Sequence, residues 1–326
     1  MKRNLLFWLS LAASLLLQLD TIQASEPVRV FILAGQSNME GHGQIRMNLD
    51  RNSGKGSLEY GVLHTADVAR LGLQDGNGSW HERDDVWISY LEREGKLKAG
   101  YGVNEDRIGP ELGFGWVVGD ALQAPVLLIK CAWGGKSLGL DFRPPSAGKP
   151  SYSLGEKTDS EIASDPSIVG RYYRELITRV KLTLARVGEI VPGSDGRYVL
   201  AGFGWHQGWN DRVSQVLNDE YEHNLTWFIR DIRRDLGAPA LPFVIAETGM
   251  SGRQEKHPRA LSLMAAQAAV AKLPEFRRSV AFVGTRDFWR PEPESPSAQS
   301  YHWNSNAETY LLIGQGMGKA MLGLLK

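Results

Sequence analysis

Cysteine is almost absent from this 326-residue sequence, which contains only Cys131. One cysteine cannot form a disulfide within the chain, so a fold held together by disulfides is excluded. Cys131 ends an apolar run, where we expect a buried, unreactive thiol. The chain also lacks an excess of charge, since 37 Lys and Arg residues balance 37 Asp and Glu residues. This balance gives no support to nucleic acid as a partner.

The signatures of nucleotide and metal sites are missing as well. The sequence has no phosphate-binding loop, and no GxGxxG follows its first apolar run, so nucleotide chemistry has no support. The seven histidines show neither HxxxH nor HxH spacing. We therefore expect no metal site.

Only one long hydrophobic run is present, and it lies at the N-terminus. Residues 5–19 are almost entirely apolar, follow the basic start Met1-Lys2-Arg3 and precede a less apolar stretch with Ala24. This layout is typical of a secretory signal peptide. We expect a signal peptide over residues 1–24 and one mature domain over residues 25–326. That domain would be secreted or periplasmic, with no stable membrane insertion after cleavage; a retained anchor is the alternative.

Short apolar runs alternate with helical patterns along the rest of the chain. The apolar runs cover residues 28–34, 125–131, 197–205, 241–247 and 279–285. The helical patterns cover residues 111–122, 168–187, 218–236, 259–273 and 307–324. Such alternation predicts βαβ units and a parallel sheet covered on both faces. Two polar stretches, 44–108 and 142–165, follow strand ends, where long loops often shape a substrate cleft.

The first apolar run leads into the pentapeptide GQSNM at residues 35–39. A serine just past the carboxyl end of a buried parallel strand lies where open α/β sheets place reactive groups. The glycine permits a sharp turn, and a following helix start would direct backbone N–H groups at an anion. Ser37 is thus a candidate nucleophile, with an ordinary helix-capping serine as the alternative.

Three further segments carry glycine or polar residues in the same pattern. They are WGG at 133–135, WHQGWND at 205–211, and SYHWN at 300–304 before the last helical pattern. Acyl transfer needs a nucleophile, a base and hydrogen-bond donors aimed at the oxyanion. The residues able to supply these groups are Ser37, His302, Gly134, Gly135 and either Gln207 or Asn210.

These motifs, together with Gly-Pro-Glu at 109–111, resemble those of SGNH hydrolases of the sialate O-acetylesterase and carbohydrate esterase family six group. The resemblance covers nearly the whole chain after residue 24, and GQSNM is its most diagnostic block. It implies an α/β fold, a three-layer α/β/α sandwich with a five-stranded parallel sheet of the SGNH or flavodoxin-like type. Long loops would lie over the carboxyl edge of the strands. It also implies a serine esterase that removes O-acetyl groups from carbohydrate, of sialic acid or plant and algal polysaccharide type, without a cofactor.

Carried over position by position, the resemblance makes Ser37 the nucleophile and His302 the base. Relatives usually place an aspartate three residues before the histidine, where this sequence has Gln299. Glutamine can orient an imidazole ring, but it cannot stabilise an imidazolium as a carboxylate does. Either another carboxylate replaces the aspartate, or a Ser-His dyad works with a backbone carbonyl, or the enzyme is weak. The candidates for that carboxylate, in order of preference, are Asp287, Glu294 and Glu308.

The resemblance also assigns oxyanion donors. The backbone amides of Ser37 and Gly135 match two of them, and the third has two candidates. The family's Trp-x-Gln-Gly pattern indicates Gln207, which we favour. The broader superfamily's Gly-x-Asn-Asp block is spelled by residues 208–211 and indicates Asn210 instead.

Three residues near these motifs are candidates for substrate contact. Glu247 ends the fourth apolar run and could contact sugar hydroxyls or cap a neighbouring loop. His206, like His42, is either a packing residue or a substrate contact rather than a second base. Trp209 is the third candidate, since flat aromatic faces suit sugars.

Two alternatives to a carbohydrate esterase remain open at this point. One is a hydrolase of the same fold that acts on non-sugar esters, although the loops are rich in residues that suit hydroxylated substrates. The other is a carbohydrate-binding protein that has lost catalysis. Gln299 favours that second alternative, whereas Ser37 and His302 oppose it.

Overall fold

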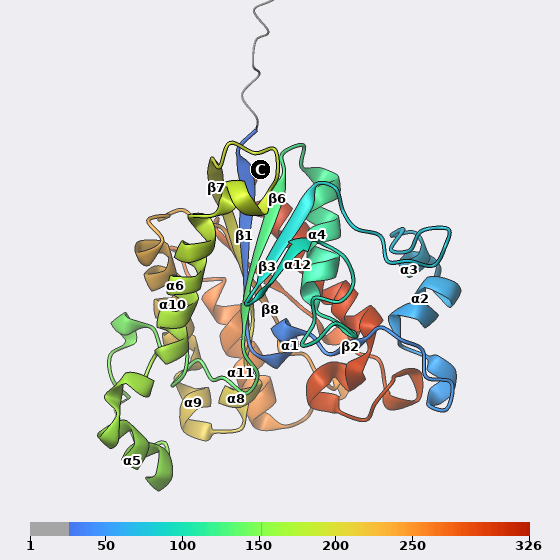
Figure 1. Ribbon diagram of the computed structural model, residues 1–326. Helices are drawn as coiled ribbons and strands as arrows, with labels where there is room; N and C mark the ends of the chain where they lie inside the picture. Colours follow the sequence, from blue (N-terminus) through green and yellow to red (C-terminus); the bar gives the residue numbers. More distant parts are fainter. Residues whose placement is uncertain (1–25, 151) are drawn as a thin grey trace, which may run out of the picture.

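The computed structural model describes residues 26–150 and 152–326, so the signal peptide expected over residues 1–24 lies outside the described residues. At its centre is a seven-stranded sheet with the order β4-β3-β6-β1-β7-β8-β9 (Figure 1). Every neighbouring pair is parallel except β3 and β4, which run antiparallel at one edge. The predicted α/β class with a parallel sheet is confirmed.

All five predicted strands are present. They are β1 (Val28–Gly35), β6 (Val126–Ala132), β7 (Tyr198–His206), β8 (Phe243–Ala246) and β9 (Val280–Val283). Nearly every residue of β1, β6 and β8 is buried, and so are the last six residues of β7. The edge strand β9 has only its first residue buried. Helices cover both faces of a parallel sheet, so its central strands need apolar residues at successive positions.

The predicted count of five strands is too low, because the polar stretch 44–108 contains two more strands of the sheet. These are β3 (Val86–Tyr90), which pairs with β6, and β4 (Arg93–Lys96) at the edge. The stretch also holds a small two-stranded sheet of β2 (Gly43–Gln44) and β5 (Arg107–Ile108). Charged residues surround β3 and make up much of β4. Edge strands commonly carry charge, which prevents further strand pairing.

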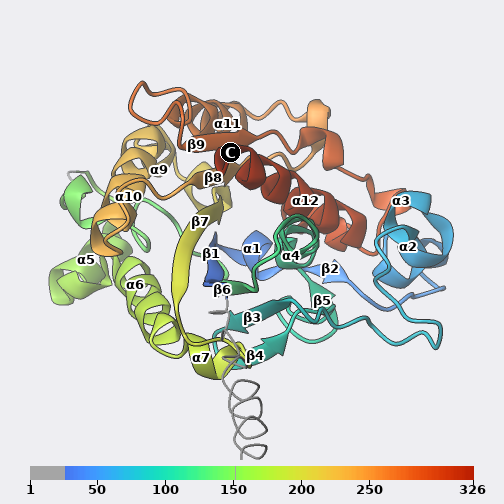
Figure 2. The same ribbon diagram turned by 90° about the horizontal axis from the view of Figure 1, so that it is seen from above.

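The helices form two layers (Figure 2). On one face lie α4 (Pro110–Ala121) and α12 (Ala307–Leu324), whose side chains share a core cluster with Phe31 and Leu33 of β1. On the other face lie α6 (Arg171–Leu184), α10 (Tyr221–Asp235) and α11 (Pro258–Val270), which share a second cluster with Val30 and Ile32. Alternate residues of β1 thus face opposite layers. The three-layer α/β/α arrangement is confirmed.

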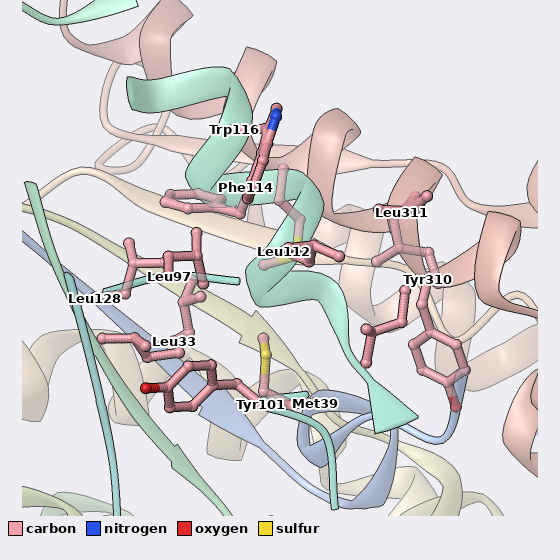
Figure 3. Close-up of a cluster of buried hydrophobic side chains, with 14 of the residues drawn as sticks. Leu33, Met39, Leu97, Tyr101, Leu112, Phe114, Trp116, Leu128, Tyr310 and Leu311 are labelled. Carbon is pink, nitrogen blue, oxygen red and sulfur yellow. The ribbon is translucent and has the colours of Figure 1, made fainter. Parts of the chain in front are cut away.

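Shorter helices complete the described fold. They are α1 (Ser37–Glu40), α2 (Leu58–His64), α3 (Ala66–Ala69), α5 (Glu156–Ser164), α7 (Val187–Ile190), α8 (Trp209–Arg212) and α9 (Gln215–Asp219). Figure 3 shows the first core cluster, in which Met39 of α1 and Tyr310 of α12 belong with the side chains of α4. The start of the chain and its last helix therefore pack into one core.

The register of the central strands brings three of the sequence motifs to one edge. Gly35 of β1 is paired with Ala132 of β6 on one side and with His206 of β7 on the other. The residues that follow these three positions therefore leave the sheet together at its carboxyl edge. Within residues 26–150 and 152–326, no helix has both the length and the apolar character needed to cross a membrane.

Candidate active site

Ser37 lies two residues beyond β1, at the first position of α1, and its side chain is only 7% exposed. Gly35 makes this turn possible because β1 and β7 approach closely there. A Cβ atom built on Gly35 would lie 2.1 Å from the carbonyl oxygen of His206, closer than any side chain allows. The backbone N–H of the first residue of a helix has no partner within that helix. The N–H of Ser37 is therefore available to a ligand.

Gln36 ties this turn to the loop after β7. Its side-chain Oε1 accepts hydrogen bonds from the backbone N–H of Gly208 (3.1 Å) and of Asn210 (3.3 Å). The side chain is 2% exposed, so these bonds are shielded from water. Buried polar groups that are fully paired hold a site in one arrangement.

A buried ion pair holds the other end of α1. Lys130 of β6 donates from Nζ to Glu111 Oε2 (2.7 Å), and both side chains are completely buried. The same ammonium group donates to the backbone oxygens of Glu40 (2.6 Å) and Tyr101 (2.6 Å). Burial lowers the pKa of Lys130, and the adjacent carboxylate of Glu111 opposes that shift. The glutamate of the Gly-Pro-Glu motif thus supports, through Lys130, the turn that carries Ser37.

Asn38 connects the turn that carries Ser37 to the loop that carries His302. Its Nδ2 donates to the backbone oxygen of Tyr301 (3.0 Å), and its Oδ1 accepts from the Tyr310 hydroxyl (2.9 Å). The Tyr310 hydroxyl also lies 3.3 Å from the backbone oxygen of His302. The structure therefore brings the residue next to Ser37 and the residue next to His302 into direct contact.

The backbone directly after His302 is strained. His302 lies in η7 (Ser300–Ser305), and Trp303, Asn304 and Ser305 have φ angles of 52°, 54° and 57°. Residues with a Cβ atom rarely adopt this left-handed region, so three in succession require support from their surroundings. Trp303 is fully buried, and Asn304 Nδ2 donates to the backbone oxygen of Arg290 (3.1 Å). These contacts hold the strained loop in place.

The imidazole of His302 is held by ring contacts. Its face stacks on the ring of His42, with centroids 3.7 Å apart and planes 10° from parallel. The Tyr301 ring approaches edge-on at 4.5 Å. Burial lowers the pKa of His302 to about 4, so the ring is neutral at pH 7, as a general base must be. Its Nδ1 atom is buried, and no described residue provides it with a hydrogen-bond partner.

None of the three carboxylates considered from the sequence lies at that Nδ1 atom, so the choice of Asp287 is corrected. Asp287 makes a two-pronged ion pair with Arg253 (2.6 and 2.7 Å), and its side chain is 65% exposed. Glu308 pairs with Arg290 at 2.9 Å, and Glu294 is exposed on a short helical turn. Asp287 and Glu308 therefore pair with arginines and not with His302.

The turn after β6 lies between Ser37 and Asn210. A Cβ atom built on Gly134 would lie 3.8 Å from Ser37 Cβ, and one built on Gly135 would lie 4.0 Å from Asn210 Nδ2. Gly135 has a φ of 71°, a conformation that glycine adopts without strain. Asn210 Nδ2 donates to the Gly135 carbonyl oxygen at 2.5 Å. An amide nitrogen carries two hydrogens, so the second one remains for an oxyanion.

The preference for Gln207 over Asn210 as third oxyanion donor is not supported by its surroundings. Gln207 is 2% exposed, and its Nε2 already faces three acceptors. The acceptors are Asp211 Oδ2 (2.5 Å), the Lys136 backbone oxygen (3.0 Å) and Gln36 Oε1 (3.3 Å). Its Oε1 accepts from the Tyr221 hydroxyl at 3.0 Å. Gln207 therefore belongs to the buried framework, and the geometry favours Asn210.

Two of the three proposed substrate contacts are also corrected. His206 is 1% exposed, and burial lowers its pKa to about 4, so it is a neutral core residue. Glu247 accepts from the backbone N–H groups of Thr285 (2.8 Å) and Arg286 (3.3 Å), so it caps a neighbouring loop. Trp209 alone is partly exposed, with its ring 5.8 Å from that of Tyr301.

The sequence motifs alone did not single out three framework residues, Gln36, Asn38 and Asp211. Asp211 is fully buried and accepts from the backbone N–H groups of Leu138 and Gly139, both at 2.8 Å. Burial raises its pKa to about 6 against the opposing effect of these bonds. All three are polar residues inside the GQSNM and Gly-x-Asn-Asp blocks, and that position was the available signal. Cys131 is buried, as predicted, and burial raises its thiol pKa to about 12.

In the part of the chain that the structure describes, no group of three or more His, Cys, Asp or Glu side chains is arranged to hold a metal ion. The chemical groups gathered at this edge are a serine, a neutral histidine and several N–H donors. This set suits acyl transfer through a serine.

Comparison with known proteins identifies the family to which this chain belongs. Over residues 27–322 the sequence matches the family described as carbohydrate esterase, sialic acid-specific acetylesterase. The chain belongs to this family and is an ester hydrolase. No curated protein sequence matches it.

Several solved structures share the fold. A protein from Arabidopsis thaliana has a TM-score of 0.55 at 17% identity, over 91% of this chain and 98% of that one. The protein NanS has a TM-score of 0.54 at 13% identity, over 92% and 98%. A carbohydrate acetylesterase from Xanthomonas citri has a TM-score of 0.52 at 13% identity, over 90% of this chain and 57% of that one. At these identities the likeness concerns the fold.

Proposed function

We propose that the protein removes O-acetyl groups from a carbohydrate, with Ser37 as nucleophile and His302 as general base. The observation that carries this proposal is the contact of Asn38 with Tyr301, because it joins the two catalytic segments. The family to which the chain belongs supports the same reaction type.

In this mechanism Ser37 Oγ attacks the acetyl carbonyl carbon while His302 accepts its proton. The tetrahedral oxyanion accepts hydrogen bonds from the backbone N–H groups of Ser37 and Gly135 and from Asn210 Nδ2. His302 then returns the proton to the departing sugar oxygen, which leaves an acetyl-enzyme. Water attacks that ester with His302 again as base, and acetate is released.

No carboxylate takes part in this scheme, so the catalytic pair is a dyad. The unpartnered Nδ1 atom of His302 and the arginine pair of Asp287 both support this version. The same unpartnered atom favours the binding protein without catalysis that the sequence left open, but membership of an esterase family opposes it. Against it stand a neutral base and free oxyanion donors beside Ser37.

A row of partly exposed aromatic rings beside His302 supports a sugar substrate. Tyr301 is 40% exposed, Trp209 lies next to it, and the Arg212 guanidinium covers the Trp209 ring at 4.3 Å. Flat aromatic faces stack on the apolar faces of sugar rings, while an arginine can donate to sugar oxygens. A lipid ester would call for a broad apolar wall instead.

The decisive experiment measures acetate release from O-acetylated sugars and from a chromogenic acetyl ester. We expect Ser37→Ala to lower kcat by at least about a thousandfold without loss of folding. The control is Ser164→Ala, in α5 and outside the site, which should leave kcat unchanged. A serine-directed phosphonate should label only the peptide with Ser37. Full activity of Ser37→Ala would exclude the mechanism, and an inactive wild type would favour the binding protein.

We also propose that the protein is exported and that its mature chain begins near Ser25. The support is the order of basic, apolar and small residues over residues 1–24. N-terminal sequencing of protein recovered from the periplasm or medium of a bacterial host should find the new terminus. An intact Met1 in the membrane fraction would indicate the anchor.

A further inference from the structure

The missing acid raises the question of what orients the His302 ring. In a Ser-His-Asp triad the carboxylate holds the imidazole by a hydrogen bond to Nδ1. Here Nδ1 is buried and has no partner among the described residues. The backbone of His302 is fixed by Tyr310 and by the strained residues that follow, but these contacts leave rotation about the side-chain bonds open.

The one described contact that covers a face of the ring comes from His42. The two imidazoles stack with a centroid separation of 3.7 Å and an interplanar angle of 10°. Such parallel contact excludes rotation of the His302 ring about its Cβ–Cγ bond unless His42 also moves. Tyr301, 4.5 Å away and at 60°, limits movement from another direction.

His42 is itself held in place by its neighbours in the chain. It lies between α1 and β2, so it follows Ser37 by five positions on the same short segment. Gly41, with a φ of 94°, passes so close to the chain at residue 109 that a Cβ atom would lie 2.1 Å from Gly109 Cα. Gly43 pairs with Ile108 in the small sheet. One rigid segment therefore carries both the nucleophile and the ring that covers the base.

We propose that His42 is a positioning residue whose ring, stacked on His302, holds the base in the orientation that receives the Ser37 proton. This inference rests on the proposed Ser37–His302 mechanism. His42 does not exchange protons with substrate. Its ring face orients His302, as the carboxylate does in a Ser-His-Asp triad.

The charge state of His42 is compatible with this role. The titratable groups that face it are His302, Arg107 of β5 and Lys130 of β6. Each of them is positively charged when protonated, which disfavours a second positive charge on His42. Burial first, and then these neighbours, lower the pKa of His42 to about 3. The ring therefore stays neutral near pH 7, and a neutral aromatic face is attractive to the imidazolium that forms during the reaction.

Replacing the ring by another aromatic ring or by a small side chain tests the role. His42→Phe keeps a stacked ring but has no nitrogen, so we expect kcat within about threefold of wild type. His42→Ala removes the ring, and the freed imidazole should lower kcat by about tenfold to a hundredfold with little change in KM. Equal losses in both variants would show that a nitrogen of His42 matters, and no loss in His42→Ala would show that the stack does not. Either result overturns the proposal.

The pH profile provides a readout that a change in overall stability would not move. Without the covering ring, water reaches His302, and its pKa should rise from about 4 towards the ordinary 6.5. The acid limb of kcat/KM in His42→Ala should therefore shift upward by one unit or more, while that of His42→Phe stays. An unmoved limb in His42→Ala overturns the proposal even if His42→Phe does not fold.

Two controls separate this inference from the mechanism on which it rests. His64→Ala removes an exposed histidine that contacts the Tyr60 ring at 4.4 Å outside the site, and it should leave kcat unchanged. His302→Ala should abolish nearly all activity. Activity of His302→Ala would refute the mechanism itself, whereas an inactive His302→Ala beside a fully active His42→Ala would refute only the role of His42.

Discussion

The segments that carry the proposed nucleophile, Ser37, and the proposed base, His302, are held by different kinds of interaction. The Ser37 turn is surrounded by buried hydrogen bonds and a buried ion pair, formed by Gln36 and by Lys130 with Glu111. The His302 ring is held by aromatic contacts, and its Nδ1 is left without a hydrogen bond. Around the first segment the side chains of Gln36, Lys130 and Glu111 are paired. The second segment combines a strained backbone with an unpaired ring nitrogen.

Because of this difference, substitutions in the two segments should affect different properties of the protein, either folding stability or catalytic rate. Removing one member of a buried polar network leaves another group unpaired in the interior, which costs folding free energy. Removing a ring that stacks beside a base changes mainly where the base points, which affects the rate. We therefore expect changes around Ser37 to affect folding first, and changes around His302 to affect kcat and its pH dependence first.

Lys130→Met is expected to have the largest effect. It leaves the carboxylate of Glu111 buried without its cation, which costs about 3–5 kcal/mol of unfolding free energy. Denaturant unfolding measures the loss. The control is Lys96→Met, which breaks the exposed pair with Asp84 and should change stability little. Equal stability of the two variants would show that the buried pair does not stabilise the fold around Ser37.

Asn210→Ala should lower kcat by about a hundredfold with little change in stability, since it removes one side-chain oxyanion donor. Gln207→Ala should instead lower the unfolding free energy by about 1–3 kcal/mol, because Asp211 and Tyr221 lose a buried partner. Initial rates and denaturant unfolding of both variants are compared. The opposite ranking in kcat would restore Gln207 as the donor.

The pH dependence should reveal the burial of the base. With a pKa of about 4, His302 is neutral at pH 5, whereas an ordinary pKa of about 6.5 would leave about 3% neutral. We expect kcat/KM at pH 5 to stay above half of its value at pH 7. An acid limb near pH 6.5 would show that the ring is solvated.

The lowered pKa values of His206 and His302 also determine how stability changes with pH. His206, like His302, has a pKa of about 4 in the folded protein and a higher one when unfolded. The unfolded chain then binds more protons between about pH 6.5 and pH 4, so stability should fall across this range as the pH decreases. Rates at pH 5 are therefore measured with a check of folding by circular dichroism.

Trp209→Ala should raise KM for a sugar substrate by about tenfold, with a small change in kcat, because it removes one of the two aromatic rings proposed to contact the sugar. Trp227→Ala is a matched control. Trp227 lies in α10 with Arg230 at 4.5 Å over its ring, as Arg212 lies over Trp209 at 4.3 Å. An unchanged KM in Trp209→Ala would place the sugar elsewhere.

The smallest effect is expected for Asp287→Asn. The carboxylate pairs with Arg253 at the surface, so kcat should stay within about twofold of wild type. A loss of about a thousandfold or more would mean that Asp287 reaches His302 in the working enzyme, and the dyad would be rejected.

Much of the fold could be predicted because the central strands are short, apolar and separated by helical patterns. The last helix matches its predicted range, 307–324. The edge strand β4 could not be predicted, since its residues Arg-Glu-Gly-Lys carry no apolar alternation. Its position is set by pairing with β3, which is a tertiary effect.

The sequence indicates candidate positions for the site, but not the contacts that their side chains make. GQSNM and the late histidine indicated Ser37 and His302, because each lies in a distinctive motif. The partners of Gln207 and Asp287 could not be predicted, since each depends on side chains that meet only in the folded protein. The stacking of His42 on His302 has no sequence signature at all.

The bond from Asn38 to Tyr301 joins residues that are 263 positions apart in the chain. Contacts of such high contact order form slowly, because a very large loop must close before they contribute. A nascent chain therefore carries Ser37 long before it has His302, the base of the proposed mechanism. In the proposed mechanism, hydrolysis of an acetyl ester requires that both ends of the fold have met, so enzymatic activity reports on this long-range contact during folding.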